Sequence, residues 1–204
     1  MYGAKYCILN SSAKPGNSKS DQNFLVIDGG TCNTYLAIVR GEIKGGGILP
    51  GLKQKYEGLR IYTPDLPEVS WQTLRKYVKN RDMSVEIFEG DTITNLCAGI
   101  LGEFHLFFDQ VINTFLNEVG DNSYVIITGG DGEMLYNLLT KRETNKNSLS
   151  TFKMIKKKCD IMYDPFLVEH GIIQAIYMSS ELHIPFNEKY SLYFMLPLMK
   201  DNKF

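Results

Sequence analysis

Short apolar runs that alternate with polar turns dominate the first part of the chain. Residues 10–23 are rich in Ser, Lys, Asn and Gly, which predicts an exposed loop. The apolar residues 24–27 predict a strand, residues 35–39 predict a second, and a polar turn leads into a third around Ile43. These runs predict a β-meander whose first turn, at residues 28–31, is polar and rich in glycine.

Several different conformations are predicted in turn for the segment that follows the meander. Residues 45–51 read Gly-Gly-Gly-Ile-Leu-Pro-Gly, which is too rich in glycine to predict a regular element. A helix is expected over residues 52–59, and two prolines predict an extended connection over residues 63–69. Trp71 is followed by several basic residues, and a solvated connecting segment is favoured there over a surface that stacks nucleic-acid bases.

A long helical stripe occupies the centre of the chain. Between residues 92 and 119, apolar side chains recur every three or four positions, which predicts a buried helix. An interruption is expected near Gly99 and Gly102, because glycine weakens a helix. The residues of the stripe are Leu96, Ile100, Phe104, Phe108, Val111, Phe115 and Val119.

Further elements complete a predicted α/β pattern. The apolar residues 124–127 predict a buried strand, which ends in a Thr-Gly-Gly motif at residues 128–130. A helix is expected to follow that motif directly. The Asp164-Pro165 pair predicts the start of a last helix, over residues 167–177.

The composition is that of an ordinary globular protein with an apolar core. The chain has 204 residues, of which 44% are hydrophobic and 12% aromatic, and its net charge is −1. This balance gives no electrostatic reason to expect a nucleic acid or an anionic membrane as a partner. Residues 1–21 carry no apolar core of a signal peptide, and no run reaches the roughly 18 apolar residues of a membrane span. A soluble, cytoplasmic protein is therefore expected.

Cysteine and histidine predict no metal site by their spacing. The four cysteines are scattered too widely for a metal knuckle or a dense disulfide framework, so reduced thiols are expected. The three histidines lack neighbours at metal-ligand spacing, and hydrogen-bonded or surface roles are favoured for them. These residues are Cys7, Cys32, Cys97 and Cys159, with His105, His170 and His183.

The glycine-rich segments share a chemistry that suits phosphate. A strand that ends in Gly-Gly beside a hydroxyl leaves backbone N–H groups accessible to phosphate oxygens. The turn Asp28-Gly29-Gly30-Thr31 adds a carboxylate that could hold a cation next to those phosphates. Thr31 and Thr34 could also donate hydroxyl hydrogen bonds to phosphate.

Each of these motifs also has a purely structural interpretation. A lone Asp-Gly-Gly favours a hairpin turn, and a lone Thr-Gly-Gly after a strand is a weak signal. The consecutive glycines at residues 45–47 are more informative, because they cost backbone entropy and usually mark a place where something approaches closely. Taken together, the three motifs favour a nucleotide site.

In their order along the chain, these motifs resemble those of one family, the type III pantothenate kinases. The resemblance runs from residue 24 to residue 178, and its most specific part is Gly-Gly-Ile-Leu-Pro-Gly at residues 46–51. The matching features are residues 28–34, residues 45–51, the pair Leu66-Pro67, Thr92 with Gly99, residues 128–130, and Asp164-Pro165 with Leu167 and Gly171-Ile172.

The resemblance implies an actin-like, ribonuclease-H-like α/β fold, with a mixed sheet flanked by helices. It also implies an activity: transfer of the γ-phosphoryl group of ATP to the 4′-hydroxyl of pantothenate, the first step of coenzyme A biosynthesis. Such kinases use a monovalent cation, potassium or ammonium, and Mg²⁺ with ATP. They act as homodimers, with the substrate site near the interface.

By similarity, roles can be assigned to individual residues. Asp28 would bind the monovalent cation, which agrees with phosphoryl transfer being mainly positioning and charge neutralisation. Thr92, Gly46 and Gly47 are assigned to the pantothenate side. The ATP side is assigned to Gly29, Gly30, Thr31, Thr34, Gly129 and Gly130. The catalytic base is not identified.

Two parts of the family pattern are absent or altered. The first Asp-x-Gly-Asn-Thr turn, which cradles ATP phosphates in the family, has no counterpart in this chain. The family's Gly-x-Asp-Arg element has its nearest match at Gly3, where Lys5 and Tyr6 replace Asp and Arg. A lysine is protonated near neutral pH and is a poor base. The expected organisation is a polar leader, a kinase domain truncated at its N-terminus and an unassigned tail, over residues 1–23, 24–178 and 179–204.

Three functions are compatible with this pattern. An active pantothenate kinase is expected first. The second is a degenerate kinase fold that binds nucleotide, or that pairs with another chain supplying the missing half. The third is a non-enzymatic regulator, because some relatives of this kinase were first described as transcriptional accessory proteins; the near-neutral charge gives that hypothesis no independent support.

Overall fold

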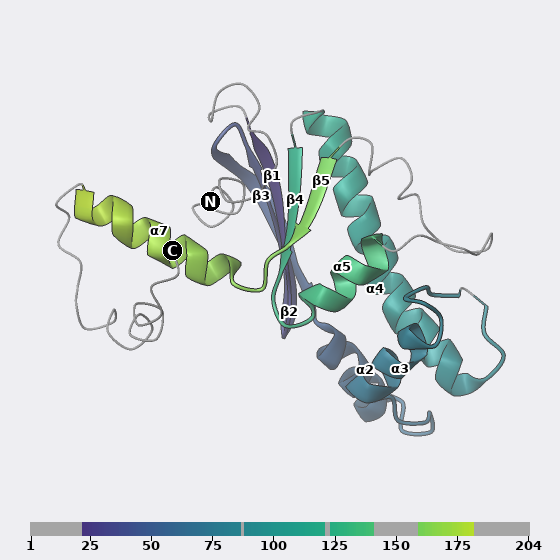
Figure 1. Cartoon of the computed structure of the whole chain (residues 1–204). Helices are drawn as coiled ribbons and strands as arrows, with labels where there is room; N and C mark the ends of the chain where they lie inside the picture. Colours follow the sequence, from purple (N-terminus) through teal and green to yellow (C-terminus); the bar gives the residue numbers. More distant parts are fainter. Residues whose placement is uncertain (1–21, 87, 121–122, 141–158, 182–204) are drawn as a thin grey trace.

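A five-stranded mixed sheet forms the centre of the molecule (Figure 1). The computed structural model describes residues 22–86, 88–120, 123–140 and 159–181. The strands lie in the order β3-β2-β1-β4-β5; the first three pair antiparallel, and β4 and β5 continue the sheet parallel to β1. Their bounds are β1 (Asn23–Gly29), β2 (Cys32–Val39), β3 (Glu42–Pro50), β4 (Ser123–Thr128) and β5 (Cys159–Tyr163).

This strand order confirms the predicted fold class. An antiparallel meander extended by two parallel strands is the topology of ribonuclease-H-like domains, to which actin-like domains belong. Parallel neighbours cannot be joined by a hairpin and need a crossover connection. A helix, α5, lies in the connection from β4 to β5, and three more lie in the longer connection from the meander to β4.

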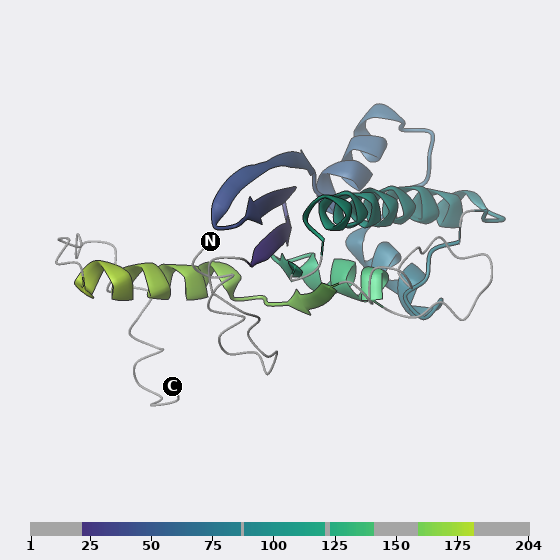
Figure 2. The same ribbon diagram turned by 90° about the horizontal axis from the view of Figure 1, so that it is seen from above.

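The helices are distributed unequally over the two faces of the sheet. Of the helices that the structure describes, four gather on one face, whereas the last one, α7, leads away on the opposite side (Figures 1 and 2). The four are α2 (Leu52–Tyr62), α3 (Trp71–Lys79), α4 (Thr92–Val119) and α5 (Gly132–Thr140), and the last is α7 (Leu167–Glu181).

Side-chain alternation along the strands divides the core in the same way. In β1, Leu25 and Ile27 belong to the large apolar cluster formed with the helices, whereas Phe24 belongs to a smaller cluster on the other face. That smaller cluster includes Leu167 from the start of α7. Each fully buried side chain of this size contributes about 1.5–3 kcal/mol of transfer free energy, so the helix-covered face carries most of the stability.

The long helix α4 follows the predicted apolar stripe. Ile100, Phe104 and Phe108 are buried in the large cluster. The interruption expected near Gly99 and Gly102 is wrong: the helix runs unbroken for 28 residues. Each interior glycine costs roughly 1 kcal/mol, and burial of the stripe offsets that cost. The helix begins after Asp91, whose carboxylate accepts the N–H groups of residues 93 and 94 at 3.0 and 3.1 Å.

The solvated connecting segment expected after Trp71 is also wrong, because these residues form α3. A capping box starts this helix: the Thr73 N–H donates to the Ser70 hydroxyl at 3.2 Å, and the Thr73 hydroxyl accepts the Ser70 N–H. Leu74, Tyr77 and Val78 are buried. These residues occupy positions i, i+3 and i+4, the spacing of the apolar face of a helix, so the sequence did carry a signal for this helix. The short strand β5 was not predicted either.

Several expectations concern residues that the structure does not describe. They include the leader as far as residue 21, the tail from residue 182, Lys5, Tyr6 and His183. Among the described residues, no helix combines the length and the apolar character that a membrane span requires.

Candidate nucleotide and cation site

The carboxyl ends of β1 and β4 bring three polar side chains into one row. Asp28 is paired with Thr34 of β2 on one side and with Thr128 of β4 on the other. Residues that are directly opposite in neighbouring strands point to the same face of a sheet. Asp28 is half-buried in this row. The loops that leave these strands are the two glycine motifs found in the sequence.

The loop after β4 folds directly against Asp28. Gly129 has a φ of +88°, and a Cβ placed on it would lie well under 3.0 Å from the Asp28 Oδ1 atom and from the Gly29 carbonyl oxygen. Only glycine fits such a backbone at such a close approach. The Asp131 N–H donates to the Gly29 carbonyl oxygen at 2.8 Å, which joins the two loops. The first and third glycine motifs of the sequence are therefore in contact.

Asn33 ties the first glycine turn to the end of β3. Its buried side chain accepts the Gly30 N–H at 3.2 Å and donates to the Pro50 carbonyl oxygen at 3.1 Å. The Gly51 N–H donates to the Thr31 carbonyl oxygen, also at 3.1 Å. A Cβ on Gly51 would lie well under 3.0 Å from backbone oxygens of that turn. The end of the Gly-Gly-Ile-Leu-Pro-Gly segment thus packs on the 28–31 turn.

The expectation that residues 45–51 form no regular element is wrong, because β3 extends as far as Pro50. What approaches these glycines is the chain itself: a Cβ on Gly47 would lie 2.7 Å from ring atoms of Tyr35. Tyr35 in turn packs on Phe107 of α4, with ring centroids 5.9 Å apart. At Gly45, φ is +150°, next to an irregularity in the pairing of β2 with β3. The glycines therefore let the sheet close over an aromatic side chain.

The residues assigned to pantothenate are not gathered at this edge. Gly46 and Gly47 lie within the edge strand β3, opposite Leu36 and Tyr35. Thr92 is exposed and is the first residue of α4, at the end of the helix that lies away from the sheet (Figures 1 and 2). Their roles toward substrate stay predictions.

Two carboxyl groups and the N-terminus of α5 lie at this edge. Burial raises the pKa of the Asp131 carboxyl above its ordinary range. Asp28 is a second carboxyl of the same edge, and α5 begins there with its backbone N–H groups, whose dipoles favour anions. Within the described ranges, no three acidic, histidine or cysteine side chains cluster as metal ligands. A cation at Asp28 would therefore use that carboxylate with carbonyl oxygens, a donor set that suits hard cations.

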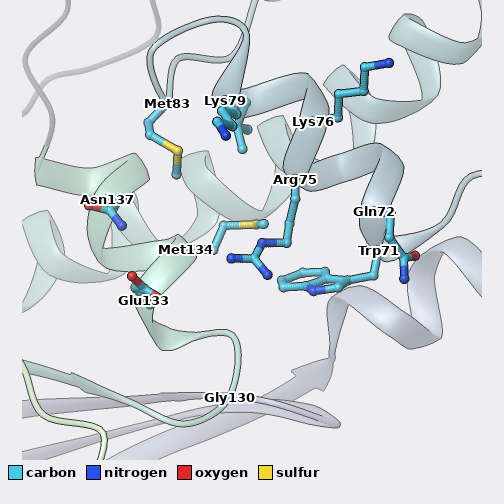
Figure 3. A pocket seen from close by; sticks show the side chains of 11 residues that line it. Trp71, Gln72, Arg75, Lys76, Lys79, Met83, Gly130, Glu133, Met134 and Asn137 are labelled. Atoms are coloured by element: carbon cyan, nitrogen blue, oxygen red, sulfur yellow. The ribbon is translucent and has the colours of Figure 1, made fainter.

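A pocket that the sequence did not predict opens beside the second glycine loop (Figure 3). It has a volume of about 630 Å³ and lies between α3 and α5, with Gly130 at its border. Trp71 and Arg75 line it from α3, and Glu133 and Asn137 line it from α5. The sequence analysis did not predict the α3 side of the pocket because it interpreted residues 71–79 as a connecting segment. Only a helix places Trp71 and Arg75 on one face.

The topology and the glycine loops at the carboxyl edge define a domain of the actin-like, ribonuclease-H-like class. The sequence comparison then gives the family. A sequence model of type III pantothenate kinase matches residues 11–114, which is half of the chain. The protein belongs to the type III pantothenate kinase family.

Named relatives share the same description. The type III pantothenate kinase of Flavobacterium johnsoniae is 35% identical over 115 residues, which is 56% of this chain and 43% of that protein. The type III pantothenate kinase of Phocaeicola vulgatus is 33% identical over 119 residues, or 58% of this chain and 43% of that protein. The chain thus spans less than half the length of each of these two relatives.

Among solved structures, the apo pSK41 ParM protein aligns with a TM-score of 0.49 and 12% identity, over 89% of this chain and 48% of that one. At this level of likeness the alignment carries no argument about function. The fold class follows instead from the strand order and from the family.

Proposed function

We propose that this chain forms the nucleotide- and cation-binding half of a type III pantothenate kinase, which phosphorylates the 4′-hydroxyl of pantothenate with ATP. The observation that carries the proposal is that the other two glycine segments both pack on the turn of residues 28–31. Gly129 lies against the Asp28 Oδ1 atom, and Gly51 packs on the 28–31 turn. Membership of the family supports the kinase reaction.

In this proposal the carboxyl edge holds the phosphate chain of ATP. Thr31 is exposed at the first turn, and Thr34 lies beside Asp28 in the row of polar residues. Their hydroxyls donate to phosphate oxygens, and the glycines let those oxygens approach the backbone closely. The N-terminus of α5 adds a favourable dipole behind Gly130.

Asp28 holds the monovalent cation, potassium or ammonium, in this proposal. Mg²⁺ enters with ATP and is not assigned to a side chain of this half. The cations supply neutralisation of phosphate charge, which is what phosphoryl transfer mainly requires of its surroundings. The chain's own contribution is to hold the Asp28 carboxylate between β2 and β4, where the strand pairing and Gly129 restrict its position.

Thr92 contacts pantothenate near a homodimer interface in this proposal. Its surroundings support the idea, because the neighbouring Phe88 is 92% exposed and Ile93 is 43% exposed. Large apolar side chains exposed together often mark a surface that meets another protein. A second copy of the chain would cover these side chains. Thr92, which lies away from the phosphate edge of its own chain, would then lie close to the second copy.

A turnover assay tests the kinase proposal directly. The chain is incubated with ATP, pantothenate, potassium and Mg²⁺, and ADP formation is followed by a coupled enzyme reaction. Turnover that depends on pantothenate and on potassium is the expected result for an active kinase. An absence of turnover under all these conditions would contradict the catalytic proposal for this chain.

A second candidate function is nucleotide binding without turnover, with another chain supplying the remaining half. The observation that favours it is that Gly129 and Asp131 pack on the 28–31 turn and form a phosphate-binding edge in which no catalytic base is assigned. Thermal denaturation with and without ATP separates the two functions. A rise of melting temperature with ATP that is lost in Thr31→Val, combined with no turnover, indicates this second function. No rise in either protein would count against both.

A further inference from the structure

A largely buried carboxylate connects α3, and the turn after it, to the segment that leads into α4. The Glu89 side chain is 10% exposed and pairs with the Arg81 guanidinium, whose Nη2 atom lies 3.0 Å from each carboxylate oxygen. The Tyr77 hydroxyl of α3 donates to the same carboxylate at 2.7 Å. A buried carboxylate is costly unless it is paired and hydrogen-bonded. These contacts meet that requirement and hold Glu89 against α3.

The two donors to this carboxylate are themselves held in place. Tyr77 is buried, and its hydroxyl also accepts the Glu86 N–H at 3.3 Å. The Arg81 guanidinium lies over the Tyr77 ring, 4.1 Å from its centre, which is a cation–π arrangement. Burial and, next, the hydrogen bond to Glu89 raise the pKa of Tyr77, so its hydroxyl keeps its proton and stays a donor near neutral pH. The Glu89 carboxylate therefore has two partners with restricted positions.

The turn after α3 directs the following segment back to these groups. Asp82 and Met83 have φ values of +51° and +62°, in a region that residues other than glycine rarely adopt. The Met83 N–H donates to the Val78 carbonyl oxygen at 2.8 Å, which closes the turn. Such unfavourable conformations persist where surrounding contacts hold them, and they are common at functional sites. The chain then returns to the Tyr77 hydroxyl, which contacts it twice.

Glu89 lies three residues before Thr92, the residue assigned above to pantothenate. Asp91 caps α4, because its carboxylate accepts the N–H groups of residues 93 and 94. Gly90 is thus the single residue between two anchored ones, Glu89 on the α3 side and Asp91 on α4. Two fixed points this close together restrict the backbone that enters α4. The position of Thr92 therefore depends on the contacts of Glu89.

We propose that Glu89 is a positioning residue for pantothenate binding, because its contacts with Tyr77 and Arg81 hold Thr92 in place at the start of α4. This inference rests on the proposed function, in which Thr92 contacts pantothenate. It gives a role to α3, which lies outside the glycine motifs. Glu89, Tyr77 and Arg81 touch neither substrate in this proposal, and their effect on pantothenate passes through Thr92.

The full chain with Glu89→Gln tests this role. The substitution keeps the size of the side chain but removes the charge that pairs with Arg81. Pantothenate affinity, measured by calorimetry in the presence of potassium, should fall about tenfold, because loss of a charged hydrogen bond makes the binding conformation of the segment less populated. ATP affinity should stay unchanged, since the phosphates are proposed to lie at the carboxyl edge of the sheet. A general loss of structure would instead weaken both.

A control and a double substitution sharpen the experiment. Glu103→Gln removes a different ion pair of α4, in which the Glu103 Oε1 atom lies 2.6 Å from the Lys55 Nζ atom, and should leave both affinities unchanged. Thr92→Val replaces the hydroxyl with a methyl group. In the Thr92→Val chain, Glu89→Gln should not weaken pantothenate binding further, because the two residues act as one unit. Backbone amides of residues 88–95 should exchange faster in Glu89→Gln than in the natural chain.

The outcomes separate this inference from the proposed function. If the natural chain binds pantothenate and Glu89→Gln binds it as tightly, or exchanges its amides at residues 88–95 no faster, the inference fails and the proposed function stands. The inference is also overturned if Glu89→Gln weakens binding by the same factor with and without the Thr92 hydroxyl, or if it weakens ATP and pantothenate binding equally. If the natural chain binds no pantothenate, the inference fails together with the pantothenate part of the proposed function.

Discussion

Glycines at the carboxyl edge of the sheet and glycines in the helices differ in how closely neighbouring atoms pack against them. At Gly51 and Gly129, a Cβ would lie well under 3.0 Å from atoms of a neighbouring segment. At Gly58 in α2 and Gly99 in α4, a Cβ would meet nothing within 4 Å. The edge glycines are therefore required by the packing of the candidate site, whereas the helical ones are replaceable. Composition alone does not distinguish the two groups.

The largest effect is expected for Gly129→Ala. The new Cβ would require a left-handed backbone, which costs about 1–2 kcal/mol, and would displace the Asp28 carboxylate and the Gly29 carbonyl. We expect a loss of unfolding free energy of at least about 3 kcal/mol, together with loss of ATP binding. Urea denaturation measures the first and calorimetry the second. Gly130→Ala is the control, since a Cβ there meets nothing within 4 Å. Equal stability of the two variants would contradict the account.

A somewhat smaller loss is expected for Gly51→Ala. Its Cβ would collide with backbone oxygens of the first turn, so β3 and the turn would have to separate. We expect a loss of about 2–3 kcal/mol of unfolding free energy, again from urea denaturation. Gly30→Ala is the comparison, because the nearest atom to a Cβ there is 3.9 Å away. The packing of β3 on the turn would be in doubt if Gly51→Ala were as stable as Gly30→Ala.

Replacing the helical glycines by alanine should stabilise the protein, in contrast to the edge glycines. Gly58→Ala and Gly99→Ala place a methyl group in open space and remove an interior glycine from a helix. Each is expected to raise the unfolding free energy by about 0.5–1 kcal/mol. Thermal denaturation of each single variant checks this, and a lower melting temperature in either would mean that its helix needs the glycine.

The smallest expected effect on stability comes from the charge of the Asp131 carboxyl. Because burial raises the pKa of Asp131, the charged form is disfavoured in the folded protein, and stability falls as the pH rises from the ordinary Asp range through the raised pKa. Asp131→Asn lacks this charge. It should therefore be slightly more stable than the natural chain near neutral pH, and the difference should shrink toward about pH 4. Melting temperatures of both proteins across this range provide the measurement, and a difference that does not vary with pH would contradict the cause given.

The sequence predicted elements well where periodicity was long or strand ends carried glycine. The stripe from Leu96 to Val119 identified α4, and the residues around Asp28 identified the first two strands. Prediction failed at residues 45–51, because glycine content hid the strand β3. The glycines fit in that strand because the ring of Tyr35, from β2, packs across Gly47.

The candidate site was only partly predictable for a related reason. The sequence pointed to Asp28 and to Gly129, but not to the contact between them, which depends on the parallel pairing of β1 with β4 across about a hundred intervening residues. It pointed away from Trp71, because basic residues masked the apolar face of α3. Asn33 gave no signal at all: its role rests on hydrogen bonds to backbone groups of two turns.

The central claim is that the loops after β1 and β4 form one phosphate site. Hydrogen exchange of the backbone amides, with and without ATP and Mg²⁺, tests it most directly. The account predicts slower exchange on ATP addition at residues 28–34 and 128–132, and unchanged exchange at residues 42–46 of β3. Protection confined to other segments, with none at both loops, would contradict it.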